Sequence, residues 1–322
     1  MKVLLIILAS ALAFALVSGF AVTVIIAVLI FRAIFVRKSA DQWSRANSEP
    51  GANPDHDAMH ALAEEWYNAH RQYAKEISIT NDGLRLAGQY LDFGFNRCVI
   101  ISSGRTEGSV YSTVFAQPYV ESGYNILVPD SRAHGHSEGK YVTMGYKEHR
   151  DILAWVRYAH EELSCETVVL HGVCVGGATS VYAATDDAAP EYLAAVTVEG
   201  LFEDIYEVLR RRIIMRGRKT FPVLQELWLI CLAKFGWGFR KLSPSERIAT
   251  LKKPILFIHS KEDLSSLPEA GERLFEKCGS SDKRIVWTES GSHSHIRLSH
   301  REEYDGAIKS FLEDLDHSRE IK

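Results

Sequence analysis

The stretch VVLHGVCVGGATS, residues 168–180, predicts a buried strand that ends in a sharp glycine-rich turn and continues as a helix. At its centre, Cys174 stands between Gly172 and Gly176 in the pattern G-x-C-x-G. This pattern between a strand and a helix is typical of a nucleophile elbow, here with Cys at the nucleophile position. Side chains larger than hydrogen beside such a strained turn would collide with the strand or the helix. We therefore predict that Cys174 is a nucleophile, with a buried structural cysteine as the alternative.

Strand and helix patterns alternate on both sides of this turn. A pattern of this kind predicts a mainly parallel sheet covered by helices on both faces, which is an α/β fold. The expected strands are 75–81 and 84–93, which form a hairpin, then 97–104, 124–130, 167–172, 193–200, 253–260 and 283–290. The expected helices are 58–76, 112–123, 146–163, 176–185, 268–278 and 303–315.

An acid and a base follow Cys174 in the order that the elbow requires. Asp263 comes directly after one predicted strand, and His293 comes after the next. The imidazole would take the thiol proton, and the carboxylate would hold the imidazole in the correct tautomer. The competing candidates are Glu262 for the acid, and His295 and His300 for the base.

The oxyanion hole is expected to consist of backbone N–H groups. One donor is Val175, the residue after the nucleophile. The second is Arg105, which follows Gly104 in the loop after the strand 97–104. Donors fixed where negative charge develops lower the barrier to acyl transfer. The alternative for this loop is a glycine turn without a catalytic role.

Composition excludes several classes of function. The net charge is −4, and residues 1–38 hold four basic and no acidic residues, so the remainder carries −8. A body this acidic is not expected to bind nucleic acid. The five cysteines include no CxxC pair, which argues against a disulfide framework and against a zinc site built on paired thiolates. The pairs HGH (134–136) and HSH (293–295) lack a matching carboxylate or cysteine pattern, so no metal or cofactor is expected.

The N-terminus predicts a membrane anchor. Residues 3–31 contain no charged residue, whereas a bilayer core needs only about 20 apolar residues in a helix. A cleaved signal peptide is the alternative, but its apolar region is typically shorter, about 7–15 residues. The basic residues Arg32, Arg37, Lys38 and Arg45 follow this segment. The positive-inside tendency then favours a cytoplasmic location for the large domain.

Three segments are expected: an anchor in 1–38, a juxtamembrane linker and helix in 39–75, and an α/β domain in 76–322. Within the last, residues 201–252 are too long for a simple connection and are interpreted as a cap. The cap combines a basic stretch, 208–220, with an aromatic and apolar stretch, 221–239. Helices packed on the core are the preferred interpretation, and contact with anionic lipid is the alternative.

Five stretches resemble the α/β-hydrolase superfamily, most closely its bacterial membrane-anchored esterase and lysophospholipase-like branch. They are SSGRTEG, GYNILVPDSRAHGHSEGKY, HGVCVGGAT, KPILFIHSKEDLSSLP and HSHIRLSHREEYDGAIKSFL, within residues 76–316. The resemblance implies an α/β-hydrolase fold, favours His293 over His295, and makes the turn with Asp130 and Ser137 a scaffold. The chain departs from the family at Ser103, where His is frequent, at Ala133, where Gly is usual, and at Cys174.

Together these features predict a hydrolase that cleaves small carboxylic esters or thioesters through Cys174, His293 and Asp263 and an acyl-enzyme intermediate. A thioester intermediate also suits transfer, so an acyltransferase is one alternative. The local sequence GVCVGG is similar to the corresponding box of polyhydroxyalkanoate synthases. A non-catalytic binding protein with the same fold is the other alternative. The sequence leaves the oligomeric state open.

Overall fold

The structure is a computed structural model that describes residues 1–38, 54–238 and 243–320. The chain forms two compact units. The smaller unit combines Met1–Val36 with Ile205–Lys241, and the larger unit combines Arg37–Asp204 with Leu242–Lys322. Each unit is described separately below.

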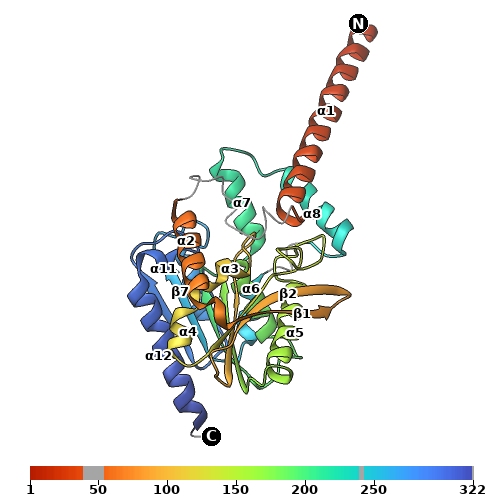
Figure 1. The fold of residues 1–322 in the computed structure, drawn as a ribbon. Coiled ribbons are helices and arrows are strands. Elements are labelled where there is room, and N and C mark those ends of the chain that lie inside the picture. Colours follow the sequence, from red (N-terminus) through yellow and green to blue (C-terminus); the bar gives the residue numbers. More distant parts are fainter. Residues whose placement is uncertain (39–53, 239–242, 321–322) are drawn as a thin grey trace. The chain divides into compact units, whose positions relative to one another are not determined.

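The larger unit is built on an eight-stranded sheet with the order β1-β2-β4-β3-β5-β6-β7-β8 (Figure 1). Strands β1 and β2 form the predicted antiparallel hairpin, and β2 is also antiparallel to β4. All pairs from β4 to β8 along the sheet are parallel, as predicted. The strands are β1 (Ala74–Asn81), β2 (Leu84–Leu91), β3 (Arg97–Ser102), β4 (Asn125–Pro129), β5 (Thr167–Val173), β6 (Leu193–Glu199), β7 (Ile255–Ser260) and β8 (Lys283–Thr288).

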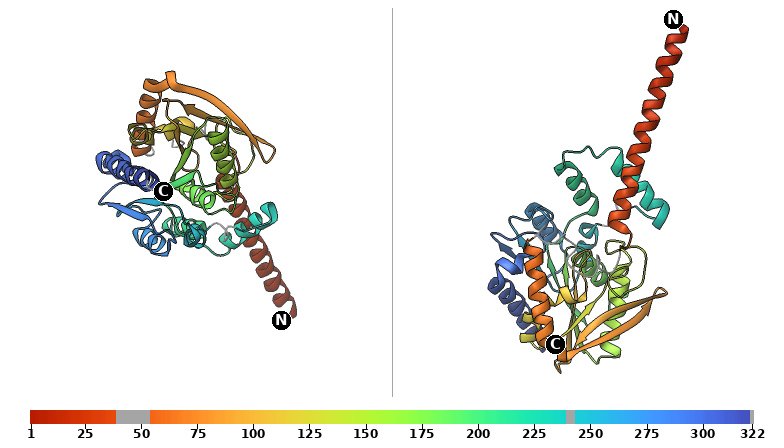
Figure 2. Two further views of the ribbon diagram at one scale, coloured as in Figure 1. Left: turned by 90° about the horizontal axis from the view of Figure 1, so that it is seen from below. Right: turned by 45° about the horizontal axis from the view of Figure 1, so that its top comes forward.

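Helices cover both faces of this sheet (Figures 1 and 2). Helix α4 packs on α12, and α5 packs on α6. The helices of this unit are α2 (Pro54–His70), α3 (Ser109–Ser112), α4 (Gln117–Glu121), α5 (Glu148–Glu161), α6 (Val175–Ala184), α9 (Pro244–Arg247), α10 (Pro268–Lys277), α11 (Ile296–Ser299) and α12 (Arg301–Glu320). The 3-10 turns are η1 (Arg71–Tyr73), η2 (Thr113–Phe115) and η4 (Ile248–Thr250).

The hydrophobic core explains why the strands have continuous apolar sequences. Every residue of β4, β5, β6 and β7 is buried. Strands covered on both faces have no side for solvent, so polar and apolar residues do not alternate along them. Aromatic side chains such as Phe115, Tyr119 and Phe311 fill the space between the sheet and its helices.

Two expected helices differ from the structure. The predicted helix 112–123 is split into α3, η2 and α4, because Pro118 lacks an N–H and stands at the start of α4 rather than inside a longer helix. The predicted helix 58–76 begins earlier, at Pro54, and its last three residues belong to β1. Of the predicted linker 39–57, residues 39–53 lie outside the described residues, and 54–57 are the first turn of α2.

The smaller unit consists of α1 (Lys2–Phe35), α7 (Ile205–Met215) and α8 (Val223–Phe235). Thr23 Oγ1 donates a hydrogen bond to Glu226 Oε1 at 2.8 Å, and the Phe235 ring contacts Phe31 and Phe35. Helix α1 is long and apolar enough to cross a membrane. Most of the segment 201–252 predicted as a cap therefore lies in one compact unit with α1.

Candidate active site

The elbow at Cys174 has the strained geometry that its glycines suggest. Cys174 follows β5 directly, precedes α6, and has φ 54° and ψ −111°, a conformation that non-glycine residues rarely adopt. Its N–H donates to the Glu199 carbonyl at 2.9 Å, which fixes the turn against the end of β6. The side chain is half-buried, in contrast to the four other cysteines, which are buried. Strain of this kind is typical of functional sites.

The glycines of the elbow allow three backbone segments to meet. A Cβ on Gly176 would lie 1.8 Å from the Ser102 carbonyl oxygen, and a Cβ on Gly172 would lie 2.3 Å from the Gly176 oxygen. Neither backbone contact could be relieved by rotating a side chain. The loop after β3 carries Arg105, and the first residues of this loop are thereby held against the elbow.

His293 and Asp263 form a hydrogen-bonded pair. His293 Nδ1 lies 2.7 Å from Asp263 Oδ2, and Asp263 is almost completely buried. Burial opposes the charge of this carboxylate, but the His293 imidazole and the N–H groups of Ser265 and Ser266, at 2.7 and 2.8 Å, lower the pKa of Asp263 below its usual value. The carboxylate is therefore charged and oriented toward the imidazole.

The other nitrogen of His293 is available for proton transfer. His293 Nε2 is buried and has no hydrogen-bond partner among the described residues. Burial lowers the pKa of His293, but the interactions with Cys174 and with the Asp263 carboxylate outweigh it and raise the pKa well above its usual value. Cys174 is thus close enough to His293 to interact with it and to raise its pKa.

The competing candidates have different surroundings in the structure. Glu262 is exposed, whereas Asp263 is buried against His293. His295 Nε2 lies 3.2 Å from His56 Nδ1 on α2, and burial lowers the pKa of His295 to about 4. The third candidate, His300, bonds Ser290 Oγ at 2.9 Å.

Gly200 allows β6 to approach the His293–Asp263 pair. Its φ is +55°, and a Cβ there would lie 3.2 Å from two atoms of His293 and 3.3 Å from Asp263 Oδ2. The predicted acid and base, from different loops, therefore meet beside the ends of β6 and β7, one strand away from Cys174.

Sequence reasoning missed a buried polar chain behind the elbow. Tyr304 on α12 donates to Glu199 Oε2 at 2.7 Å and lies 3.2 Å from His171 Nε2, while the Tyr119 hydroxyl lies 2.9 Å from His171 Nδ1. Because the Tyr304 proton goes to Glu199, its oxygen accepts from His171 Nε2–H. Burial lowers the pKa of His171 to about 3, so its imidazole is neutral.

Glu199 connects the elbow to the loop of His293. Its carbonyl accepts the Cys174 N–H, and its carboxyl accepts the Ile296 N–H at 3.2 Å. Burial raises the pKa of Glu199 to about 7, against the hydrogen bonds that favour its charged form. A carboxylate at the end of an apolar strand was the only signal in the sequence that could have identified it.

A second carboxyl group lies in the loop after β3. Glu107 Oε2 accepts the Gly104 N–H at 2.6 Å, and burial raises the pKa of Glu107 to about 7. His293 opposes this shift, and Glu199 adds to it. The candidate site therefore contains two carboxyl groups that change their charge near neutral pH, Glu107 and Glu199, beside the charged Asp263.

The predicted oxyanion donors occupy suitable elements. Val175 is the first residue of α6, where backbone N–H groups have no partner within the helix. Arg105 is half-buried in the loop whose first residues touch the elbow. Ser103, which replaces the frequent His, bonds Ser112 Oγ at 2.7 Å within the same loop region. The roles of Val175 and Arg105 stay predictions.

The turn after β4 is held by hydrogen bonds of Asp130 and Ser137. Asp130 accepts N–H groups from Ser109 and His136 at 2.8 and 2.9 Å, and Ser137 Oγ donates to the Asp130 carbonyl at 2.6 Å. Ala133 adopts φ 62° at the position where the family usually has Gly.

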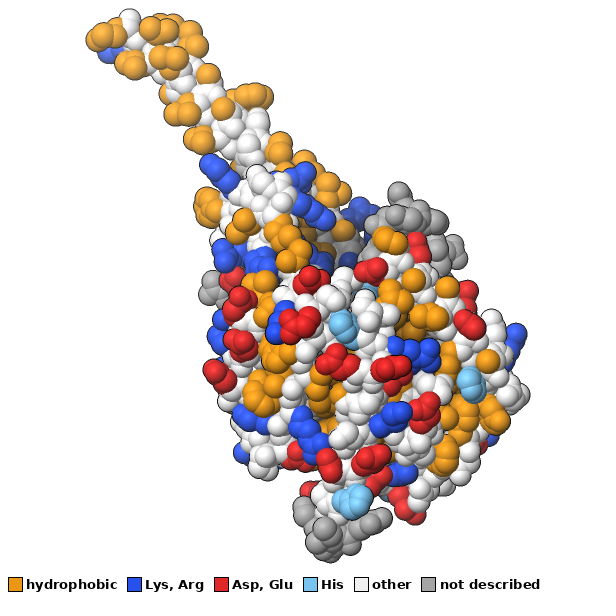
Figure 3. Space-filling model, turned by 90° about the vertical axis from the view of Figure 1, so that its left-hand side faces the viewer, with side chains coloured by type: hydrophobic (Ala, Val, Ile, Leu, Met, Phe, Trp, Pro, Cys, Tyr) orange, Lys and Arg blue, Asp and Glu red, His pale blue; other side chains and the backbone are white. Residues whose placement is uncertain are grey.

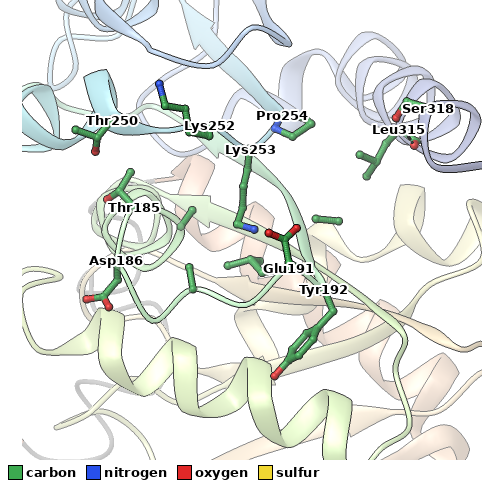
Figure 4. Close-up of a pocket in the computed structure, with 14 residues that line it drawn as sticks. Thr185, Asp186, Glu191, Tyr192, Thr250, Lys252, Lys253, Pro254, Leu315 and Ser318 are labelled. Carbon is green, nitrogen blue, oxygen red and sulfur yellow. Dashed lines mark hydrogen bonds between the residues drawn. The ribbon is translucent and has the colours of Figure 1, made fainter. Parts of the chain in front are cut away.

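A large cavity lies at the opposite ends of the strands. Its volume is about 810 Å³, and its lining includes Leu193, the first residue of β6, and Pro254, which precedes β7 (Figure 4). Lys253, which also lines it, donates to the Pro190 carbonyl at 3.0 Å. None of the three predicted catalytic residues lines this cavity. Among the described residues, no group of three or more His, Cys, Asp and Glu is placed to hold a metal ion.

Known proteins resemble the chain in both sequence and fold. Residues 98–244 match a family described as alpha/beta hydrolase fold. YqkD of Bacillus subtilis is 28% identical over 226 residues, which are 69% of this chain and 73% of YqkD. The membrane protein YNL320W of Saccharomyces cerevisiae is 26% identical over 194 residues, 60% of this chain and 62% of that one. The esterase Pf2001 of Pyrococcus furiosus superposes with a TM-score of 0.62 at 22% identity, covering 75% of this chain and 92% of the esterase.

Proposed function

We propose that this chain, whose α/β-hydrolase fold and family match support its place in the α/β-hydrolase superfamily, hydrolyses carboxylic esters or thioesters. The proposal is supported by a half-buried thiol on a positive-φ turn that interacts with His293, and by the hydrogen bond of His293 to Asp263 at 2.7 Å. The esterase named among the structural neighbours supports the same class of reaction.

The reaction begins with proton transfer from the Cys174 thiol to His293 Nε2, which has no other partner among the described residues. The sulfur attacks the carbonyl carbon of the substrate, and the N–H groups of Val175 and Arg105 stabilise the oxyanion. The imidazolium then returns the proton to the leaving alcohol or thiol, leaving a thioester on the sulfur. Water, deprotonated by His293, releases the acid and restores the thiol.

The raised pKa of His293 supports this sequence of steps. The imidazolium that forms when the thiol is deprotonated is stabilised by the negative charges of Cys174 and Asp263. Asp263 is held by two backbone N–H groups and cannot rotate away without losing them. Preorganisation of this kind lowers the cost of forming the charged intermediate.

The proposal includes a membrane anchor. Helix α1 is long and apolar enough to span a bilayer, and one relative is named a membrane protein. We assign residues 1–38 to the anchor, 39–75 to the connection and 76–322 to the catalytic domain with its cap. The basic residues Arg32, Arg37 and Lys38 favour a cytoplasmic location for the catalytic domain. The substrate is a small acyl ester or thioester of the kind handled by esterases and lysophospholipase-like enzymes.

The test uses the full-length protein in detergent with p-nitrophenyl esters and acyl thioesters. We expect Cys174→Ala to lower turnover by at least about 10³-fold, because the acyl intermediate can no longer form. Cys278→Ala is the control, since Cys278 is buried and lies outside the site. Equal turnover by the wild type and Cys174→Ala contradicts the proposal. Analysis of the products with an added alcohol separates hydrolysis from acyl transfer.

A further inference from the structure

The two halves of α1 have different surroundings. Every residue from 3 to 22 is exposed except Ser18, and hydrophobic side chains cover this surface (Figure 3). From Thr23 onward, one stripe of the helix is covered, with Ala27, Phe31 and Phe35 buried. A helix of 34 residues is about 51 Å long, whereas the hydrocarbon core of a bilayer is about 30 Å thick. The exposed half alone is long enough to span that core.

Helix α8 lies beside the covered half of α1 and runs in the same direction. Glu226, near the start of α8, bonds Thr23, and Phe235, at its end, contacts Phe31 and Phe35. The beginning of α8 and the loop before it are therefore nearest to the exposed half of α1. Any membrane that surrounds residues 3–22 must lie close to this loop.

The outer side of α8 is apolar. Leu229 is 53% exposed and Leu232 is 38% exposed. Next to them is a cavity of about 350 Å³ between the start of α7 and α8, lined by Tyr206, Leu224, Gln225, Trp228 and Leu229. Large apolar side chains left in water are costly, so this face suits an apolar surrounding.

The end of α7 and the loop between α7 and α8 combine apolar and basic side chains. Ile214, Met215 and Phe221 are 48%, 64% and 74% exposed. Residues 208–225 contain six basic and no acidic residues, and Arg212, Arg216, Arg218 and Lys219 among them are exposed. Exposed apolar side chains interspersed with cations match the boundary between acyl chains and anionic headgroups.

We propose that α8, the loop before it and the last residues of α7 form a second membrane-contact surface beside α1, which binds anionic phospholipid. This surface comprises Ile214, Met215, Arg216, Arg218, Lys219, Phe221, Leu229 and Leu232. Phe221 and Leu229 enter the acyl region, and the cations contact the phosphates. The proposal rests on the membrane anchor of the proposed function, since α1 brings the surface to the bilayer.

The experiment places a diazirine-bearing amino acid at single positions of the full-length protein in vesicles. Vesicles of phosphatidylcholine mixed with phosphatidylserine are compared with phosphatidylcholine alone. The positions are Phe221 and Leu229 in the contact surface, Leu12 in the exposed half of α1, and Glu313 on α12 as an exposed control. After irradiation, lipid adducts are measured by mass spectrometry. We expect lipid adducts at positions 12, 221 and 229, and none above background at 313.

The outcomes separate this inference from the membrane anchor. Adducts at position 12 without adducts at 221 and 229 leave the anchor in place and overturn the second contact surface. No adducts at any of these three positions overturn both. Crosslinks at 221 or 229 to another copy of the chain, in place of lipid, show that a protein interface covers the surface and also overturn the inference.

A charge variant tests the anionic headgroups. We expect the triple variant Arg216→Gln, Arg218→Gln and Lys219→Gln to lower the lipid yield at position 221 in phosphatidylserine vesicles by at least about tenfold. The yield at position 12 should stay unchanged. Arg157→Gln, an exposed cation on α5 in the larger unit, is the matched control and should have no effect at either position. An unchanged yield at position 221 in the triple variant overturns anionic recognition.

Discussion

The two ends of the parallel strands differ in chemistry, although both belong to the same buried sheet. The amino ends of β6 and β7 border a cavity of about 810 Å³. The carboxyl ends carry a strained cysteine, a histidine with a raised pKa and three carboxyl groups, Asp263, Glu199 and Glu107, in partly or fully buried surroundings. The cavity and the candidate site therefore lie at opposite ends of the strands: backbone strain and buried charge mark the candidate site, and none of the predicted catalytic residues lines the cavity.

The reason lies in how parallel strands end. At the carboxyl end, successive loops must turn into helices, and glycines such as Gly172, Gly176 and Gly200 bring three loops within contact. At the amino ends of β5, β6 and β8, the chain enters the strand after a helix. The four predictions below test this contrast, beginning with the largest expected effect.

The first prediction concerns the acid of the proposed triad. We expect Asp263→Asn to lower kcat by about 10³–10⁴-fold, because the amide neither stabilises the imidazolium nor holds the productive tautomer. Glu191→Gln, which changes an exposed carboxylate at the amino-end cavity, should leave kcat within about twofold. Esterase kinetics give kcat for both variants. A comparable loss of kcat in both would contradict the proposed difference between the two ends of the strands.

The second prediction concerns the elbow. Gly176→Ala should destabilise the protein by about 3 kcal/mol, because the new Cβ meets the Ser102 carbonyl at 1.8 Å and neither backbone can move freely. The control is Gly306→Ala on α12, where a Cβ meets nothing within 4 Å, and this change should be neutral or stabilising by up to about 1 kcal/mol. Denaturant unfolding in detergent checks both, and equal stability of the two variants contradicts the prediction.

The third prediction concerns the neutral His171 behind the elbow. Its pKa is about 3 in the folded state, below the ordinary 6.5, so the unfolded chain binds its proton first as the pH falls. This group therefore costs stability below about pH 6.5, amounting to about 2 kcal/mol between about pH 7 and about pH 4.5. His171→Gln should remove this contribution to the change of the unfolding free energy with pH.

The contribution of Glu199 to stability changes with pH in the opposite direction. Its folded pKa of about 7 lies above the ordinary 4.5, so its contribution to stability is present below pH 4.5 and is lost as the pH rises through about 7. The difference between wild type and His171→Gln at each pH isolates the histidine. If the unfolding free energy of the two proteins changes with pH in the same way, His171 is not a neutral buried imidazole in the folded state.

The fourth and smallest effect is expected at Tyr304. Tyr304→Phe removes the hydroxyl between Glu199 and His171 and should cost about 1–2 kcal/mol of unfolding free energy. Tyr192→Phe, at the amino-end cavity, is the control and should change stability by less than about 0.5 kcal/mol. Chemical denaturation of both variants at one pH gives the comparison.

Local patterns made most of the fold predictable. The hairpin at Asp82 and Gly83 and the buried parallel strands follow from turn residues and apolar runs, and the structure confirms them. The split of 112–123 at Pro118 was missed, because residues flanking a proline can remain helical in separate pieces. The boundary at Pro54 was missed because a polar linker and a polar first helical turn have the same composition.

The candidate site was predictable only in part. The residue types and the order of Cys174, Asp263 and His293 could be read from the chain, because each follows a strand. The choice between His293 and His295 could not be made from spacing alone, since both stand in one loop. Their surroundings in the structure differ: one imidazole faces Asp263 and the other faces His56 on α2.

The sequence by itself determined the alternation of strands and helices, the glycine corner around Cys174 and the apolar N-terminal helix, because each depends on neighbouring residues. The tertiary structure alone decided that Glu199, His171 and Tyr304 form one buried hydrogen-bonded chain. It also decided that the cap segment packs on the C-terminal half of α1. These contacts join residues more than 100 positions apart, where no local periodicity or propensity can specify the partner.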